Sequence, residues 1–226
     1  MAIRAPVRVP MAPEDVFYPD SDGQGMPDGD PQRKTMIDLL DILEERYRND
    51  PDVYVSGNIF VYYEKGNRAA VFSPDILVVK GVAKQDRPMY KLWEENYKAP
   101  DFVLEIAAPT TYKEDTGPKK GLYALLGIRE YFLYDRTGEF LWPQLQGYRL
   151  VGREYVPVGG EWPRSEVLGI EFRLEEGRLR LYDAETGERL LTREERLDQE
   201  AAARREAEAE VERLRAELAR LKGDKD

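Results

Sequence analysis

The sequence predicts a mixed α/β domain, and three observations lead to that fold class. A helical apolar period over residues 34–48 is followed by short runs rich in β-branched and aromatic residues, which are typical of strands. Between residues 102 and 134, a strand, a helix and a strand follow one another with short joints, as in a βαβ unit. Beyond residue 135, short apolar runs alternate with glycine-containing turns. We therefore expect a mixed α/β centre with a small antiparallel β extension.

The elements of the first half follow an arm, residues 1–31, in which proline, glycine and aspartate are frequent. The helix of residues 34–48 ends before Pro51. Residues 80–100 are basic and favour a loop, with a short helix near residues 90–97. The predicted strands of this half cover residues 54–55, 59–63 and 76–79.

The elements of the second half begin with a buried strand at residues 102–107. A helix over residues 115–126 follows and ends at Gly127, which suits a C-cap. Residues 131–134 form the next apolar strand. The small antiparallel extension is expected from strands at residues 139–142, 147–151, 154–158, 171–174 and 178–182.

The C-terminal segment, residues 191–226, is a charged helical tail. Its apolar residues fall on two heptad positions, but Arg204 and Glu200 interrupt the seam before its last two heptads. A short coiled coil, which would form a homodimer or bind a partner helix, and a solvated helix both agree with this pattern. The seam residues are Leu190, Leu197, Val211 and Leu218 at one position and Ala207, Leu214 and Leu221 at the other.

The length and composition limit the organisation and the chemistry. The 226 residues suffice for one ordinary domain with appendages, which we place at residues 32–190 between the arm and the tail. The chain has no Cys and no His, which excludes disulfides, zinc–thiolate sites, Cys nucleophiles and histidine acid–base chemistry. A bound metal would be held by carboxylates, carbonyls and water, which favours Mg²⁺ or Mn²⁺.

The charge and the apolar pattern bear on partners and location. The formal net charge is -10, but most of the excess acid lies in residues 14–52, and the centre of the chain is nearly neutral. The charge therefore neither supports nor excludes a nucleic-acid groove. No run reaches 18 apolar residues and the first thirty residues lack a signal-peptide stretch, so we expect a cytoplasmic protein without a membrane partner.

Two acidic residues stand in strand contexts that favour a metal site. Asp75 opens the strand at residues 76–79, and Glu105 lies inside the apolar run of residues 102–107. A carboxylate in such a run is unfavourable unless it is coordinated or hydrogen-bonded. If the two strands are neighbours, both carboxylates face one divalent ion, with the backbone carbonyl of Ile106 as a third ligand. Such a site activates water for attack on a phosphodiester.

A lysine is expected beside a site of this kind, where it orients water and offsets phosphate charge. Lys119 lies four residues after Asp115 and four before Tyr123, so the three share one helix face. Structural interpretations remain open for each residue. Glu105 suits a structural salt bridge, Asp115 an N-cap or first-turn acid, and Tyr123 the core.

Three stretches carry a resemblance to a known family. They are residues 73–79, residues 99–111, and residues 115–135 with Asp115, Lys119, Tyr123, Gly127 and Glu130-Tyr131-Phe132-Leu133-Tyr134-Asp135. In this order and spacing the chain closely resembles the Uma2 family, also called DUF820, over roughly residues 53–190. The resemblance implies the restriction-endonuclease-like fold of the PD-(D/E)XK superfamily, a mixed central sheet flanked by helices. It also implies a divalent-metal-dependent endonuclease that hydrolyses DNA, with Asp75, Glu105 and the Ile106 carbonyl holding Mg²⁺ or Mn²⁺.

The resemblance includes one departure from the superfamily pattern. The lysine of that pattern stands two residues after the second acid, and this position is Ala107 here. Members with this arrangement move the lysine to the following helix, which makes Lys119 the candidate and Lys120 the reserve. Asp115 and Glu64 are supporting candidates. A basic, aromatic-bearing surface for DNA, with a solvated loop as its alternative, is predicted from Lys80, Lys84, Arg87, Lys91, Trp93 and Lys98.

Three functions remain open on the sequence. The first is a Mg²⁺-dependent DNA endonuclease with Asp75, Glu105 and Lys119 as catalytic residues. The second is a catalytically degenerate nuclease fold that binds nucleic acid or protein. The third is an interaction protein that works through its C-terminal coiled coil. We favour the first, because paired acids in these strand contexts are hard to explain by structural roles alone.

Overall fold

The computed structural model describes residues 16–19 and 30–223, so most of the N-terminal arm lies outside the described residues. The predicted helix of residues 34–48 is confirmed but begins earlier, at Asp30. Residue 193 starts the C-terminal helix, and the domain limits at residues 32 and 190 stay predictions. The elements in chain order are α1 (Asp30–Arg46), β1 (Val53–Ser56), β2 (Val61–Tyr62), β3 (Val71–Phe72), β4 (Ile76–Lys80), β5 (Tyr90–Lys91), η1 (Leu92–Glu94), β6 (Phe102–Ile106), α2 (Tyr112–Glu114), η2 (Asp115–Lys119), α3 (Lys120–Leu126), β7 (Glu130–Tyr134), β8 (Leu145–Val151), β9 (Glu154–Pro157), β10 (Arg164–Ser165), β11 (Ile170–Glu175), β12 (Arg178–Asp183), β13 (Arg189–Leu190) and α4 (Arg193–Gly223).

A six-stranded mixed sheet forms the centre, with the strand order β1-β4-β6-β7-β8-β9. Strands β6 and β7 are parallel, and every other neighbouring pair in this sheet is antiparallel. The parallel pair requires a crossover, which the helical segment of residues 112–126 supplies. The mixed α/β class is therefore confirmed. Strands β8 and β9, predicted for the small extension, belong to the central sheet instead.

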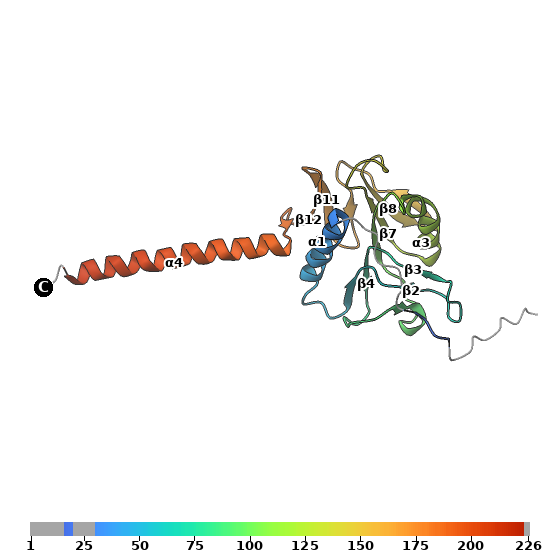
Figure 1. Cartoon of the computed structure of the whole chain (residues 1–226), viewed down its shortest axis with the longest axis horizontal. Coiled ribbons are helices and arrows are strands. Elements are labelled where there is room, and N and C mark those ends of the chain that lie inside the picture. Colours follow the sequence, from blue (N-terminus) through green and yellow to red (C-terminus); the bar gives the residue numbers. More distant parts are fainter. Residues whose placement is uncertain (1–15, 20–29, 224–226) are drawn as a thin grey trace, which may run out of the picture.

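Both faces of the central sheet are covered, because side chains alternate along the buried strands. Ile76 and Val78 point into one apolar cluster with α1 and with the antiparallel sheet β10-β11-β12-β13. Leu77 and Val79 point into a second cluster with Tyr123 of α3 and with the three-stranded sheet β3-β2-β5. Figure 1 shows α1 and α3 on opposite sides of β4 and β7. Polar side chains meet at one edge of this layered core, where β4 begins and β6 ends.

The predicted strand at residues 139–142 is wrong, and Asp135 explains why. Its carboxylate accepts hydrogen bonds from the backbone N–H groups of Thr137 (2.9 Å), Phe140 (2.6 Å) and Leu141 (2.9 Å). The loop therefore satisfies its donors on one buried side chain, and no strand partner is needed. Leu141 is buried all the same, whereas Trp142 is 91% exposed.

The helix predicted at residues 115–126 exists, but it begins at Tyr112 and contains an irregular turn. Segment η2 is a π-helix with Pro118 inside it. Proline has no N–H for the helical ladder, and a π turn accommodates that loss. Gly127 ends the helix with φ 78°, as predicted for a C-cap. The short helix expected near residues 90–97 reduces to the 3-10 turn η1.

A buried acid, Glu130, joins the central sheet to β10. Its carboxylate accepts hydrogen bonds from Arg149 (3.1 Å), from the Ser165 hydroxyl and from the backbone N–H of Glu166 (2.9 Å). Glu130 is 1% exposed, and these donors replace the water that it loses. This acid therefore has a structural role.

The C-terminal helix α4 begins at a capping box. The Thr192 hydroxyl accepts a hydrogen bond from the Glu195 N–H (3.3 Å), and the Glu195 carboxylate accepts one from the Thr192 N–H (2.9 Å). Arg196 then pairs with Asp41 of α1 at 2.8 Å, which fixes the first turns of α4 on the body. In the part of the chain that the structure describes, no helix has the length and apolar content of a membrane span.

Candidate active site

The two predicted acids lie opposite each other where β4 begins and β6 ends. Ile76 pairs with Leu104 in the antiparallel register of these strands, so Asp75 lies across from Glu105. The Glu105 carboxylate accepts a hydrogen bond from the Asp75 N–H at 3.1 Å. Asp75 Oδ2 accepts one from the Ile106 N–H at 2.6 Å. Each acid is therefore held by the backbone beside the other, which fixes both side chains.

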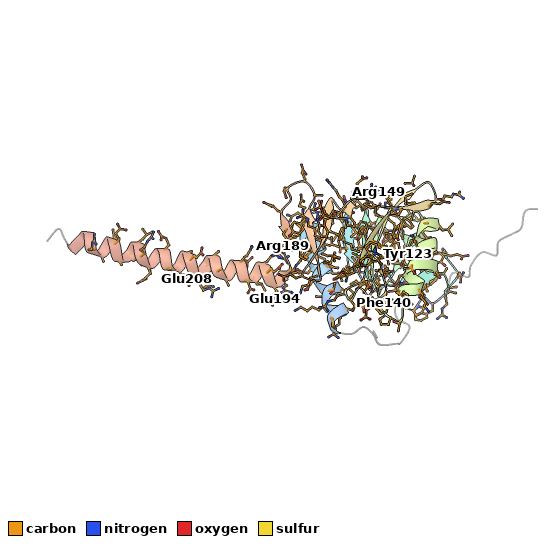
Figure 2. The ribbon with its side chains drawn as sticks, turned by 90° about the horizontal axis from the view of Figure 1, so that it is seen from above. Tyr123, Phe140, Arg149, Arg189, Glu194 and Glu208 are labelled. Carbon is orange, nitrogen blue, oxygen red and sulfur yellow. The ribbon has the colours of Figure 1, made fainter. Side chains whose placement is uncertain are left out.

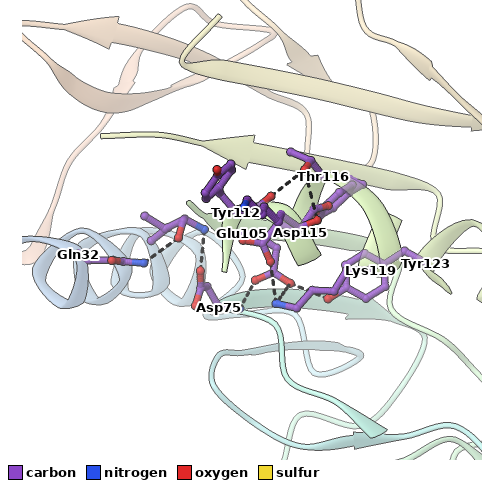
Figure 3. Close-up of polar contacts among 11 residues, drawn as sticks. Gln32, Asp75, Glu105, Tyr112, Asp115, Thr116, Lys119 and Tyr123 are labelled. Carbon is purple, nitrogen blue, oxygen red and sulfur yellow. Dashed lines mark hydrogen bonds and ion pairs between the residues drawn. The ribbon is translucent and has the colours of Figure 1, made fainter. Parts of the chain in front are cut away.

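The helical crossover adds three side chains to this pair, and Figure 3 shows them around Glu105. The Lys119 ammonium lies 3.1 Å from Glu105 Oε1 and 2.9 Å from Asp115 Oδ1. The Tyr123 hydroxyl donates a hydrogen bond to the same Glu105 oxygen at 2.6 Å. The face shared by Asp115, Lys119 and Tyr123 therefore packs on Glu105.

Asp115 is not an N-cap, but it is a first-turn acid, which is the other role in that structural interpretation. The helix begins three residues earlier, at Tyr112, and its N-cap residue Thr111 makes no side-chain capping bond. Asp115 is 1% exposed, and its backbone carbonyl accepts a hydrogen bond from the Tyr131 hydroxyl at 2.9 Å. A buried Tyr131 thus holds the π turn against the sheet, and the turn aims Asp115 inward at Lys119.

The acidic cluster contains more carboxyl groups than ammonium groups. Asp75, Glu105 and Asp115 gather around one ammonium, that of Lys119. Burial raises the pKa of Asp75 well above its ordinary value, and the neighbouring Glu105 adds to the rise. Burial also raises the pKa of Glu105, against the opposing effect of Lys119. A divalent cation at this cluster would stabilise the ionised forms of these carboxyls.

Lys119 stays a cation in this environment. Burial by itself would lower the pKa of its ammonium, but Glu105 and Asp115 outweigh burial and raise that pKa above its ordinary value. The side chain is 20% exposed, so it reaches the surface of the cluster. The group can therefore stabilise negative charge or orient a water molecule, and it is not suited to act as a base.

The donor set fits a hard divalent cation. Asp75, Glu105 and the Ile106 carbonyl all offer oxygen, the ligand type that Mg²⁺ and Mn²⁺ take. In the described part of the chain, no three acidic side chains converge on one metal position. Two carboxylates and a carbonyl would therefore bind the ion together with several waters, as Mg²⁺ commonly does in proteins.

A glutamine that sequence reasoning missed also reaches this site. Gln32 of α1 donates a hydrogen bond from Nε2 to the Ile106 carbonyl at 2.7 Å (Figure 3). The same Ile106 carbonyl is the third metal ligand expected from the sequence. A carbonyl oxygen has two lone pairs, so it can serve Gln32 and a cation together.

Gly57 supports the site from the turn after β1. A Cβ at this position would lie 2.2 Å from the Asp75 carbonyl oxygen and 3.0 Å from a methyl group of Leu40. The absence of a side chain at Gly57 therefore allows the Asp75 backbone to approach this turn.

Two of the other candidates lie apart from the acids. The Lys120 ammonium lies 3.3 Å from the ring centroid of Tyr148, and burial lowers its pKa. Glu64 is exposed in the turn between β2 and β3, where it accepts a hydrogen bond from Asn67 at 3.0 Å. Neither has a contact with Asp75 or Glu105 in the described residues.

The basic residues predicted to contact DNA make contacts within the chain. Lys80 ends β4, at the opposite end from Asp75, and donates to the Val167 carbonyl at 2.5 Å. The remaining contacts are those of Lys84 with the Tyr47 carbonyl (2.8 Å), Arg87 with Glu95 (2.8 Å), Lys91 with Glu94 (3.1 Å), Lys98 with Asp101 (2.8 Å), and Trp93 with the Tyr18 ring (5.1 Å between centroids). The structure does not bring these residues together with the acidic cluster.

Comparison with known proteins adds the family. A family model named Uma2 and described as "Putative restriction endonuclease" matches residues 7–197, which is most of the chain. The chain belongs to the Uma2 family. Family membership and the observed mixed sheet agree with the restriction-endonuclease-like fold that the sequence resemblance implies.

A solved structure is also similar to this Uma2 protein. It is described as a "putative nuclease belonging to DUF820" from Anabaena variabilis, with 13% sequence identity, 70% of each chain covered and a TM-score of 0.41. No curated protein matches the chain.

Proposed function

We propose that this Uma2 protein is a divalent-metal-dependent endonuclease that hydrolyses DNA phosphodiester bonds. The observation that carries the proposal is the pair Asp75 and Glu105 at the adjoining ends of β4 and β6, with Glu105 in contact with the Lys119 ammonium. The cluster at Glu105 holds more acids than cations and is partly open through Lys119, which suits a metal and an anionic substrate.

In this proposal Asp75, Glu105 and the Ile106 carbonyl hold Mg²⁺ or Mn²⁺. When bound, such an ion lowers the pKa of a water and offsets charge on a phosphodiester. The backbone hydrogen bonds between Asp75 and Ile106, and between Glu105 and Asp75, keep the two carboxylates oriented before the ion arrives. Preorganised ligands of this kind reduce the reorganisation that binding requires.

Lys119 is proposed to stabilise the negative charge that develops on the phosphoryl group. Its raised pKa keeps it charged, and its contacts with Glu105 and Asp115 set its position. Tyr123 is a positioning residue, because its hydroxyl holds the Glu105 oxygen that Lys119 also contacts. Lys119 thus supplies, from the helical crossover, the ammonium that the superfamily pattern places at residue 107.

The first test compares wild type with Glu105→Gln, which removes the charge and keeps the shape. Mn²⁺ binding is measured by titration, and cleavage is measured on supercoiled and linear DNA with Mg²⁺ or Mn²⁺. We expect Mn²⁺ affinity and cleavage rate to fall together, by at least about 100-fold, because losing even an indirect partner of a metal ligand costs 10- to 100-fold. The matched control is Glu114→Gln, an exposed acid in α2, which should change neither.

A second candidate function is a binding module without catalysis. It is favoured by the fact that backbone, Lys119 and Tyr123 donors engage both Glu105 oxygens, and that Gln32 engages the Ile106 carbonyl. In that case wild type would bind DNA without cleaving it, and Glu105→Gln would leave DNA affinity unchanged. That result would replace the endonuclease proposal.

A further inference from the structure

Helix α4 carries an apolar stripe that the rest of the described chain leaves uncovered. Figures 1 and 2 show the helix projecting from the body in two perpendicular views, and Glu208 lies on the projecting part. Leu197, Val211, Leu214 and Leu218 are each about half exposed there. Large apolar side chains gathered on one element indicate a surface that another protein covers.

The spacing of the stripe is that of a coiled-coil seam. Val211 and Leu218 occupy one heptad position and Ala207 and Leu214 the other, which gives the a and d positions of two heptads. Nearer the body, Arg204 and Glu200 occupy the same two positions. A polar residue at a seam position weakens association and limits the registers that pair well. The apolar contact is therefore confined to the half of α4 that is distant from the body.

The charges beside this seam distinguish the possible partners. In a parallel pair, a residue at position g faces the residue five positions later on the other helix. Glu210 would then face Arg215 of a second copy, and the same spacing in the sequence relates Glu217 to Lys222. In an antiparallel pair, position g faces g, so Glu210 and Glu217 would face acids. The charges are thus complementary for a second copy in parallel alignment and repulsive for the reverse.

The present contacts of these charges do not oppose such pairing. Glu210 forms an exposed ion pair with Arg213 of the same helix at 2.7 Å, and Arg215 lies 4.0 Å from Glu212. Exposed pairs within a helix contribute little to stability, so an exchange for pairs between helices costs little.

We propose that α4 forms a parallel, in-register coiled coil with α4 of a second copy of this chain, with Val211, Leu214 and Leu218 as its core. The two bodies then lie at the same end of the coiled coil. Arg193 begins the helix and Val211 lies 18 residues later, so the core starts about 27 Å from the body at 1.5 Å per residue. This polar length separates the bodies from the apolar core. The proposal does not depend on the proposed nuclease activity.

The first test uses the absence of cysteine from the sequence. In the full chain, Leu214→Cys places one thiol in the seam, and Ala216→Cys places one on the opposite side of the same helix. Under mild oxidation we expect Leu214→Cys to form a covalent dimer at least tenfold faster than Ala216→Cys, because residue 214 lies at a seam position that meets its counterpart in a parallel pair, whereas residue 216 faces away from the seam. Equal rates, or no dimer from either variant, would overturn the proposal.

The second test exchanges charges and measures the dimer dissociation constant by sedimentation equilibrium. Glu210→Arg and Arg215→Glu should each weaken the dimer about tenfold, because two symmetric pairs turn from attractive to repulsive. The double variant should return to within about threefold of wild type. An antiparallel pair predicts that Glu210→Arg strengthens association, and that result would refute the parallel alignment. Wild type that stays monomeric at every concentration would refute the dimer itself.

Neither readout involves DNA. If the nuclease proposal fails, the crosslink and the dissociation constants still decide this one. If the dimer fails, cleavage by wild type and its loss in Glu105→Gln still decide the function.

Discussion

Substitution of Gly57 by alanine tests how the turn after β1 supports the candidate site. The added Cβ would lie 2.2 Å from the Asp75 carbonyl oxygen, which is closer than nonbonded atoms approach. The atom in the way is backbone, at the point where β4 joins the central sheet, so it cannot rotate aside. Leu40 of α1 lies 3.0 Å from the same position, which limits movement of the turn in the other direction.

The expected loss of stability follows from this geometry. Overpacking in a filled interior costs about 1–3 kcal/mol. Since the clash is with backbone on one side and with a core leucine on the other, we place Gly57→Ala at about 3 kcal/mol. For a protein of this size, about 1 kcal/mol lowers Tm by about 2–4 °C, so Tm should fall by about 6–12 °C.

The same displacement should reach the acidic cluster. The Asp75 N–H donates a hydrogen bond to Glu105, and the Asp75 carboxylate accepts one from the Ile106 N–H. Moving the Asp75 backbone disturbs both hydrogen bonds, so Gly57→Ala should weaken Mn²⁺ binding in the fraction of the protein that remains folded. Thermal unfolding by circular dichroism and Mn²⁺ titration below Tm measure the two effects separately.

The matched control is Gly121→Ala in α3. Its Cβ would meet no atom within 4 Å, and alanine is favoured over glycine in a helix by about 0.5–1 kcal/mol. The two substitutions add the same atom and should shift Tm in opposite directions. A Gly57→Ala protein as stable as wild type, with unchanged Mn²⁺ affinity, would refute the reasoning about this turn.

Three further predictions concern buried polar groups. Tyr123→Phe keeps the ring and removes the 2.6 Å hydrogen bond to Glu105, so urea unfolding should show a loss of about 2 kcal/mol; an unchanged midpoint would contradict this role. Lys119→Met leaves Glu105 and Asp115 buried without their cation, so calorimetry at neutral pH should show a loss of stability of about 3 kcal/mol. The loss should shrink in acid, where the Glu105 carboxyl, whose pKa burial raises, is protonated. Burial alone would raise the pKa of Asp135, but hydrogen bonds from backbone donors outweigh burial and lower that pKa. The ionised Asp135 therefore stabilises the fold at pH values above its unfolded pKa of about 4. This stabilisation is lost as the pH falls through the folded pKa. The free energy of unfolding of wild type should thus exceed that of Asp135→Asn by about 1–3 kcal/mol at pH 7, and the two values should converge in acid. A constant difference from pH 7 down to pH 2 would exclude this role of the Asp135 carboxylate.

The parts of the fold that the sequence predicts well are those where local pattern and tertiary contact agree. The apolar run at residues 102–107 is strand β6, because every residue of that strand is buried between two layers. The segment 139–142 has a similar apolar content, yet the Asp135 carboxylate takes the hydrogen bonds that a strand partner would have received. Strands of two residues, such as β5, exist through pairing with distant segments and leave little local signal.

The candidate site likewise contains residues that the sequence predicts and residues that it does not. Asp75 and Glu105 could be predicted because an acid in an apolar strand is unusual in the sequence itself. The inward position of Asp115 depends on a π turn, and the only local sign of that turn is Pro118 inside a helical pattern. Gln32 could not be predicted, since its contact with Ile106 spans 74 residues and depends on how α1 packs.

The division of the site between a sheet and a helix bears on how this protein can change in evolution. Asp75 and Glu105 are attached to strands of the central core. Few substitutions in a close-packed core leave its packing intact. Lys119 and Asp115 belong to a short surface turn that contains Pro118 and contributes one buried side chain, Asp115 itself. Substitutions limited to this turn can therefore replace the cation while the sheet persists. For the proposed endonuclease, exchange of these five consecutive residues would remove the cation from the site and leave both acids on the sheet in place.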